Sequence, residues 1–86
     1  MAYYIDKDYI ILLGLHIKKI REGKNITQAQ LAIDCDFDVS VISRIENGKV
    51  NTSVSNLRLI AKALEIAIKD LFDFEEEIVK EWLITP

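Results

Sequence analysis

The segment DVSVISRIENGK, residues 38–49, holds the side chains of this sequence that are best suited to recognise another molecule. If the segment is a helix, its apolar residues Val41, Ile42 and Ile45 face one side. The opposite stripe then consists of Val39, Ser40, Ser43, Arg44 and Asn47. Hydroxyl, amide and guanidinium groups form hydrogen bonds, but none of them is an evident catalyst. The segment is therefore suited to binding rather than to a reaction.

The rest of the sequence offers little for catalysis. Cys35 is the only cysteine and His16 the only histidine, so neither a disulfide nor a zinc site can be assembled. We interpret His16 as a surface or internally satisfied residue and Cys35 as part of the core rather than a redox sensor. With no glycine-rich phosphate loop and no carboxylate dyad, the sequence predicts no enzyme, no cofactor and no metal.

The charged residues are unevenly distributed along the chain, which has a net charge of −3. Residues 18–64 carry eight basic and five acidic side chains, whereas residues 65–86 carry two basic and seven acidic ones. The middle is therefore basic and the last part acidic. This asymmetry is compatible with a polyanionic partner at one end only.

Length and composition predict one globular domain. The chain has 86 residues, half of them apolar, which is near the small end of what folds alone. We predict a single domain over residues 1–86, with a core at 9–73 and a C-terminal extension at 74–86. No apolar run approaches the roughly 18 residues of a membrane span. The first residues lack a basic region typical of a signal peptide, so we expect a cytoplasmic protein without a membrane partner.

Apolar spacing and capping residues predict an all-α fold. We expect helices at residues 8–23, 28–35, 39–47, from about 54 to 64 after Thr52 or Ser53, and 68–72. Thr27 and Gln30 have the spacing of a capping box, and Asp38 is placed to cap the third helix. Asp36 lies where the chain must reverse, and Asn47-Gly48 is typical of a left-handed helix end. Residues 74–86 extend the fifth helix or form a separate turn; a short strand pairing between YYI and WLIT is a less favoured alternative.

The second and third predicted helices meet the requirements of a helix-turn-helix. Ala32 supplies a small residue where the helices cross, Asp36 supplies the turn, and Ile42 and Ile45 anchor the third helix from within. The outer face of that helix carries side chains short and polar enough for a groove about 12 Å wide.

Residues 13–72 resemble the Xre family, the lambda-repressor-like domains of phage repressors, Cro proteins and bacterial regulators. The matching pieces are G-x-x-I-K-K-I-R at 14–21, T-Q-x-x-L-A at 27–32, V-I-S-R-I-E-N-G-K at 41–49, L-x-x-I-A-K-A-L-x-I at 57–66 and L-F at 71–72. The resemblance implies a bundle of about five short helices with a helix-turn-helix. Asp36 replaces the glycine that the family usually has in the turn, and Glu65 stands where glycine often ends the fourth helix. The carboxylates of Asp34, Asp36 and Asp38 should lower the affinity for phosphates.

The resemblance also implies roles for individual residues. The third helix would lie in the major groove, with base contacts from Val39, Ser40, Ser43 and Arg44. Phosphate contacts would come from Gln28, Asn47, Lys49 and Asn51, and Gln28 would also brace the third helix. Arg21 and Glu46 would form a structural, buried ion pair between the first and third helices. The plain alternatives are a solvated helix face and ordinary cap and loop residues.

We therefore expect a sequence-specific, double-stranded-DNA-binding transcription regulator that acts as a homodimer on a palindromic operator. Apolar residues of the fifth helix and the extension, Ile68, Phe72, Ile78 and Trp82, would form the dimer contact. Alternatively, that surface packs on the first helix and on Tyr3, Tyr4 and Tyr9. A second functional hypothesis is an antitoxin, or another interaction module, whose acidic end binds a basic toxin or regulatory protein.

Overall fold

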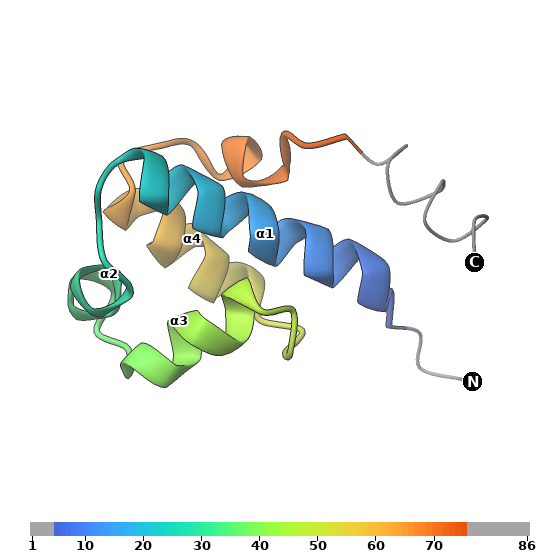
Figure 1. Cartoon of the computed structure of the whole chain (residues 1–86), viewed down its shortest axis with the longest axis horizontal. Coiled ribbons are helices and arrows are strands. Elements are labelled where there is room, and N and C mark those ends of the chain that lie inside the picture. Colours follow the sequence, from blue (N-terminus) through green and yellow to red (C-terminus); the bar gives the residue numbers. More distant parts are fainter. Residues whose placement is uncertain (1–4, 76–86) are drawn as a thin grey trace.

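The computed structural model describes residues 5–75, and all of the regular secondary structure in that range is helical. The elements are α1 (Lys7–Gly23), α2 (Gln28–Cys35), α3 (Val39–Glu46), α4 (Val54–Ala63) and the 3-10 helix η1 (Ile68–Phe72). In Figure 1, α1 runs across the molecule with η1 on one side and α3 on the other, and α2 leads into α3 at one end. The predicted all-α class is confirmed. The expected count of about five helices is slightly off, because the described residues form four α-helices and the fifth element is a short 3-10 helix.

The helix ends follow from side-chain and backbone hydrogen bonds. Thr27 Oγ1 accepts a hydrogen bond from the backbone N–H of Gln30 at 3.0 Å, so Thr27 caps α2 as predicted. The capping box is not complete, because the Gln30 amide donates to Asp34 Oδ1 at 3.1 Å instead of returning to Thr27. Asp36 adopts the left-handed conformation, with φ 58° and ψ 42°, which reverses the chain between α2 and α3.

The predicted cap at Asp38 is wrong in its chemistry. Asp38 precedes α3 with extended backbone angles, but its carboxylate makes no capping hydrogen bond. The backbone N–H of Val41, a group that a capping side chain would bind, donates to the Asp38 carbonyl oxygen at 3.0 Å. The Asp38 carboxylate is therefore left on the exposed surface.

The core lies between α1 and the four shorter elements. Its largest fully buried apolar side chains are Ile17, Leu31, Ile42, Ile60, Leu64 and Leu71. Ala32 and Ile45 are also buried, as the helix-turn-helix prediction requires. None of the helices within residues 5–75 is long and apolar enough to cross a membrane.

Gly14 lets α1 approach the end of α3 closely. A Cβ atom at this position would lie 2.3 Å from the carbonyl oxygen of Ile45 and 2.7 Å from that of Glu46. Both neighbours are backbone atoms, which cannot rotate away as a side chain would. The packing of α3 on α1 therefore depends on the absence of a side chain at residue 14.

Candidate nucleic-acid interface

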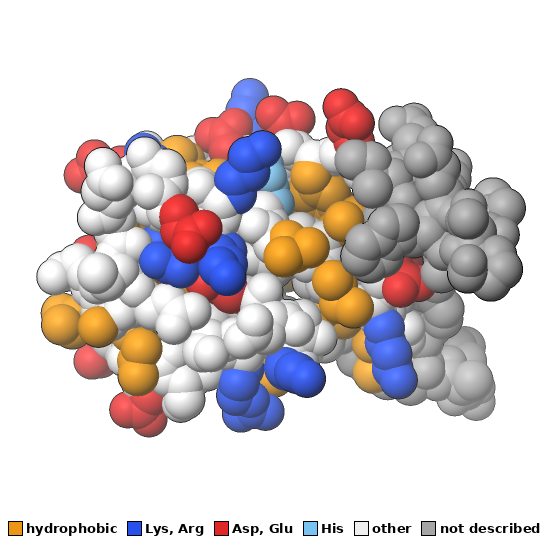
Figure 2. Space-filling model, viewed as in Figure 1, with side chains coloured by type: hydrophobic (Ala, Val, Ile, Leu, Met, Phe, Trp, Pro, Cys, Tyr) orange, Lys and Arg blue, Asp and Glu red, His pale blue; other side chains and the backbone are white. Residues whose placement is uncertain are grey.

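The outward stripe of α3 is the candidate interface. Val39 is 48% exposed, and Ser40 and Arg44 are exposed as well, while Ser43 is half-buried. Ile42 and Ile45, on the inner side of the same helix, are 1% and 3% exposed. The 3.6-residue helical period thus separates an apolar base from a polar outer face. Figure 2 shows basic side chains at the edge formed by α3 and the loop that follows it.

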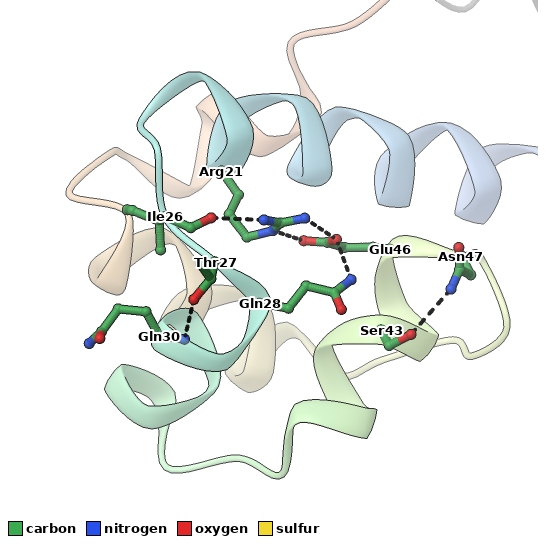
Figure 3. A network of polar contacts seen from close by, with 8 residues as sticks. All are labelled: Arg21, Ile26, Thr27, Gln28, Gln30, Ser43, Glu46 and Asn47. Atoms are coloured by element: carbon green, nitrogen blue, oxygen red, sulfur yellow. Dashed lines mark hydrogen bonds and ion pairs between the residues drawn. The ribbon is translucent and has the colours of Figure 1, made fainter.

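A buried ion pair joins this helix to α1 (Figure 3). The Nε of Arg21 lies 2.7 Å from Glu46 Oε2, and Nη2 donates to Glu46 Oε1 at 3.0 Å. The third donor, Nη1, bonds to the carbonyl oxygen of Ile26 at 2.8 Å. Arg21 is 7% exposed and Glu46 2% exposed. The pair is therefore a buried, bidentate ion pair that fixes the end of α3 against α1.

The charge of Arg21 is held by its partner. The hydrogen bond with Glu46 raises the pKa of the Arg21 guanidinium above its ordinary value, although burial alone would lower that pKa. Among the residues that the structure describes, every buried side-chain nitrogen and oxygen has a hydrogen-bond partner. The pair thus serves positioning and offers no free group for chemistry.

Gln28 adds a third helix to this network. Its side-chain amide donates from Nε2 to Glu46 Oε1 at 2.9 Å, and the side chain is half-buried. Figure 3 shows Gln28 reaching from the start of α2 toward Glu46 on α3. Gln28 therefore braces α3 against α2, the role that the resemblance implied for it. The phosphate contact expected of the same residue stays a prediction.

The expected phosphate-binding residues beyond α3 lie in and after a tight turn. Asn47 Nδ2 donates to Ser43 Oγ at 3.3 Å, so the amide that ends α3 is held near its outer face. Gly48 has φ 67°, and a Cβ atom there would lie 2.7 Å from Cγ1 of Ile11. Asn47, Lys49 and Asn51 are all exposed. The loop is thus fixed against α1 while these three side chains face solvent.

Three carboxylates lie next to the interface. Asp34, Asp36 and Asp38 are all exposed near the turn between α2 and α3.

The residue Cys35, between Asp34 and Asp36, is only 4% exposed. Burial, together with the negative charge of Asp34, raises the pKa of the Cys35 thiol. Cys35 is therefore a neutral core residue at ordinary pH.

The apolar surface expected to form a dimer contact is partly used within the chain. Tyr9 of α1 stacks on Phe72, with ring centroids 6.4 Å apart, and also packs on Phe74 at 5.2 Å. His16 accompanies this cluster, because its Nε2 lies 3.0 Å from the Asp70 carbonyl oxygen. Phe72 is still 37% exposed and Ile68 is half-buried. The other expected contact residues, Ile78 and Trp82, lie outside the described residues, as do Tyr3 and Tyr4 and the suggested strand segment WLIT.

The fold and the interface together are those of a helix-turn-helix protein. Residues 17–71 match the family model described as Helix-turn-helix. The chain therefore belongs to this family of DNA-binding transcription regulators, as its resemblance to the Xre family predicted.

Similar proteins are small regulators. Control protein C.BamHI of Bacillus amyloliquefaciens is 43% identical over 65 residues, which cover 74% of this chain and 80% of that protein. Control protein C.MunI of a Mycoplasma species is 40% identical over 72 residues, covering 81% of this chain and 97% of that protein. The crystal structure of the restriction-modification controller protein C.AhdI from Aeromonas hydrophila superimposes with a TM-score of 0.72. It is 30% identical and covers 73% of this chain and 96% of that one.

Proposed function

We propose that this protein acts in the cytoplasm as a homodimer on a palindromic DNA operator, with α3 of each copy in the major groove. The observation that carries the proposal is the exposed polar stripe of α3 above its buried apolar base. The buried Arg21–Glu46 pair and Gln28 hold that stripe in one orientation. We treat residues 1–86 as a single helix-turn-helix unit with its core at 9–73.

Base contacts come from the N-terminal half and middle of α3. Arg44 carries a planar guanidinium that matches guanine O6 and N7, a pairing worth about 1–3 kcal/mol of discrimination against other bases. Ser40 and Ser43 have hydroxyls that donate or accept, and Val39 offers an apolar contact for a thymine methyl. All four side chains lie on the exposed or half-exposed side of α3.

Phosphate contacts set the position of the domain on the duplex. Asn47, Lys49 and Asn51 offer amide and ammonium donors from the exposed turn after α3. Gln28 opens α2, where the first backbone N–H groups of a helix are available to a phosphate. Contacts of this kind fix orientation but carry no base information.

Dimerisation gives such a small reader enough contact with DNA. A two-fold dimer reads two half-sites about 34–36 Å apart, each with the same surface. Ile68 and Phe72 keep exposed apolar area for this contact, to which we add Ile78 and Trp82. The similarity to the control proteins C.BamHI and C.MunI, and to the restriction-modification controller protein C.AhdI, supports a role as a control protein of restriction–modification genes.

Selection of bound sites from random duplexes tests the proposal. We expect the selected DNA to contain two copies of one half-site, related by two-fold symmetry and separated by one helical turn. Arg44→Ala should remove the preference at one position of each half-site, while Lys19→Ala, at an exposed position of α1 beside Glu75, should leave it unchanged. Recovery of unrelated sequences at low salt would contradict the proposal and favour the hypothesis of a protein partner.

A further inference from the structure

A shallow, open hollow on the outward face of α4 is lined by apolar side chains and two cationic ones. The hollow has a volume of about 580 Å³ and is lined by Val54, Ser55, Arg58, Leu59, Lys62 and Ile68. We call these six residues the α4 groove. Val54 is 73% exposed and Leu59 is 41% exposed, and both cationic residues are exposed as well. Uncovered apolar area bordered by positive charge is suited to a partner segment that is apolar and acidic.

The chain itself contains such a segment. Residues 76–86 read EEIVKEWLITP, with glutamates at 76, 77 and 81. The same stretch carries four large apolar residues, Ile78, Val79, Trp82 and Leu83. Its carboxylates complement Arg58 and Lys62, and its apolar residues complement Val54, Leu59 and Ile68. Composition and charge therefore match this segment to the α4 groove.

The course of the chain after η1 decides which copy supplies the segment. Ile68 borders the α4 groove, but the chain then crosses to α1, where Phe74 packs on Tyr9 at 5.2 Å and on His16 at 5.6 Å. Glu75 lines a different hollow on α1, together with Leu12, Leu15 and Lys19. Figure 1 shows the described chain continuing along α1 after η1. The last described residue, Glu75, therefore lies beside α1, and η1, which packs on both α1 and α4, lies between it and the α4 groove of the same copy.

We propose that residues 76–86 of one copy lie in the α4 groove of a second copy, and that the exchange is reciprocal. The inference rests on the proposed homodimer and specifies how that dimer is held together. A two-fold arrangement fills each groove once and closes, whereas a one-sided contact would continue into a chain of molecules. The exchange also buries the apolar residues of both surfaces at the same interface.

A charge-swap experiment on the full chain tests this arrangement. The groove variant carries Arg58→Glu and Lys62→Glu, and the segment variant carries Glu76→Lys and Glu77→Lys. In either variant alone, like charges face each other, so we expect dimerisation to weaken at least about tenfold in sedimentation equilibrium. In an equimolar mixture each acidic segment meets a basic groove and the reverse, so dimerisation should return to within about threefold of the unmodified protein.

Controls separate pairing from general charge effects and from loss of fold. Lys7→Glu with Lys24→Glu makes the same change in charge as the groove variant, at two exposed positions away from the groove: the first residue of α1 and the residue that follows α1. This control should dimerise like the unmodified protein, and circular dichroism should show the same helix content for all variants. A fourth chain combines the groove and segment substitutions and should dimerise with itself.

Each other outcome overturns the inference in a recognisable way. If both variants dimerise normally, the homodimer stands but residues 76–86 do not hold it. If the mixture stays monomeric while the four-substitution chain recovers, the segment lies in the groove of its own copy. If the mixture and that chain both stay monomeric, or the α1 control weakens equally, the loss is not due to this pairing. If the unmodified protein is monomeric at tens of micromolar, the proposed homodimer itself is wrong.

Discussion

Replacement of Glu46 by glutamine is the sharpest test of how α3 is positioned. The change keeps the size of the side chain, removes its charge and replaces one of its two acceptor oxygens by an NH2 donor. Arg21, 7% exposed, then keeps a buried guanidinium without the carboxylate that is bonded to it, although its bond to the Ile26 carbonyl oxygen at 2.8 Å survives. Stranding one partner of a buried pair costs about 3–5 kcal/mol. Glu46→Gln should therefore remove much of the stability of a domain this small.

Thermal and urea unfolding followed by circular dichroism measure this loss. A domain of this size loses about 4–8 °C in Tm per kcal/mol, so we expect Tm to fall by more than about 12 °C. Glu22→Gln is the matched control, because Glu22 is exposed one residue beyond Arg21 and the charge change is the same. Its effect should stay within about 0.5 kcal/mol.

A double substitution shows whether the loss comes from the uncompensated charge. Arg21→Met with Glu46→Leu removes both charges and leaves apolar side chains of similar size, which is often close to neutral. We expect this double variant to be more stable than Glu46→Gln. Measured against the single variants Arg21→Met and Glu46→Leu, its coupling free energy should exceed about 1.5 kcal/mol. The reasoning would be refuted by a Glu46→Gln protein as stable as the Glu22→Gln control. It would also be refuted if the double variant lost as much unfolding free energy as Arg21→Met and Glu46→Leu lose together.

Three further predictions concern packing, titration and phosphate contact. Gly14→Ala should cost about 1–3 kcal/mol in urea unfolding because its Cβ meets the Ile45 carbonyl, whereas Gly23→Ala, with no atom within 4 Å, should be near neutral. Because burial raises the pKa of the Cys35 thiol, the folded state keeps its proton longer than the unfolded state. Stability should thus fall as pH rises above about 8.5, and Cys35→Ala should flatten that decline in pH-dependent unfolding. Lys49→Ala should weaken all duplexes alike and reduce the salt slope of binding by about 1, which titrations at several salt concentrations measure.

The helix pattern and most of the ends could be predicted from the sequence because they depend on nearby residues. The bounds of α2 follow from Thr27 at its start and Asp36 at its end, both of which act within one turn of the chain. The errors at Gln30 and Asp38 have the same local origin. In each case several polar groups lie within reach, and the sequence does not determine which pair forms the hydrogen bond.

Contacts between distant parts of the chain were harder to predict. Arg21 and Glu46 are 25 residues apart, and only the family resemblance brought them together before the structure did. The close approach at Gly14 was not foreseen, although a glycine inside a helical pattern is a signal for such a contact. The stacking of Tyr9 on Phe72 matches, for these two residues, the alternative that the apolar surface packs on the first helix, but the sequence did not decide between that packing and a dimer contact.

Part of the negative charge that gives this chain its net charge of −3 lies away from the α3 face. The acidic residues Asp70, Asp73 and Glu75 belong to η1 and its exit, on the opposite side of α1 from α3 (Figure 1). One helix diameter is about 10–12 Å, which exceeds the Debye length of about 8 Å at physiological salt. Their repulsion of DNA at the α3 face is therefore largely screened.

The carboxylates at the α2–α3 turn are too close to α3 for such screening. Asp34, Asp36 and Asp38 are exposed beside the start of the helix that we place in the groove, so they reduce the attraction to any phosphate backbone. That loss applies to every DNA sequence, whereas the hydrogen bonds of Arg44 form only at the correct base. When weak phosphate attraction is combined with strong base contacts, a larger share of the affinity depends on sequence. The acidic turn should thus lower overall affinity without lowering the preference for the operator.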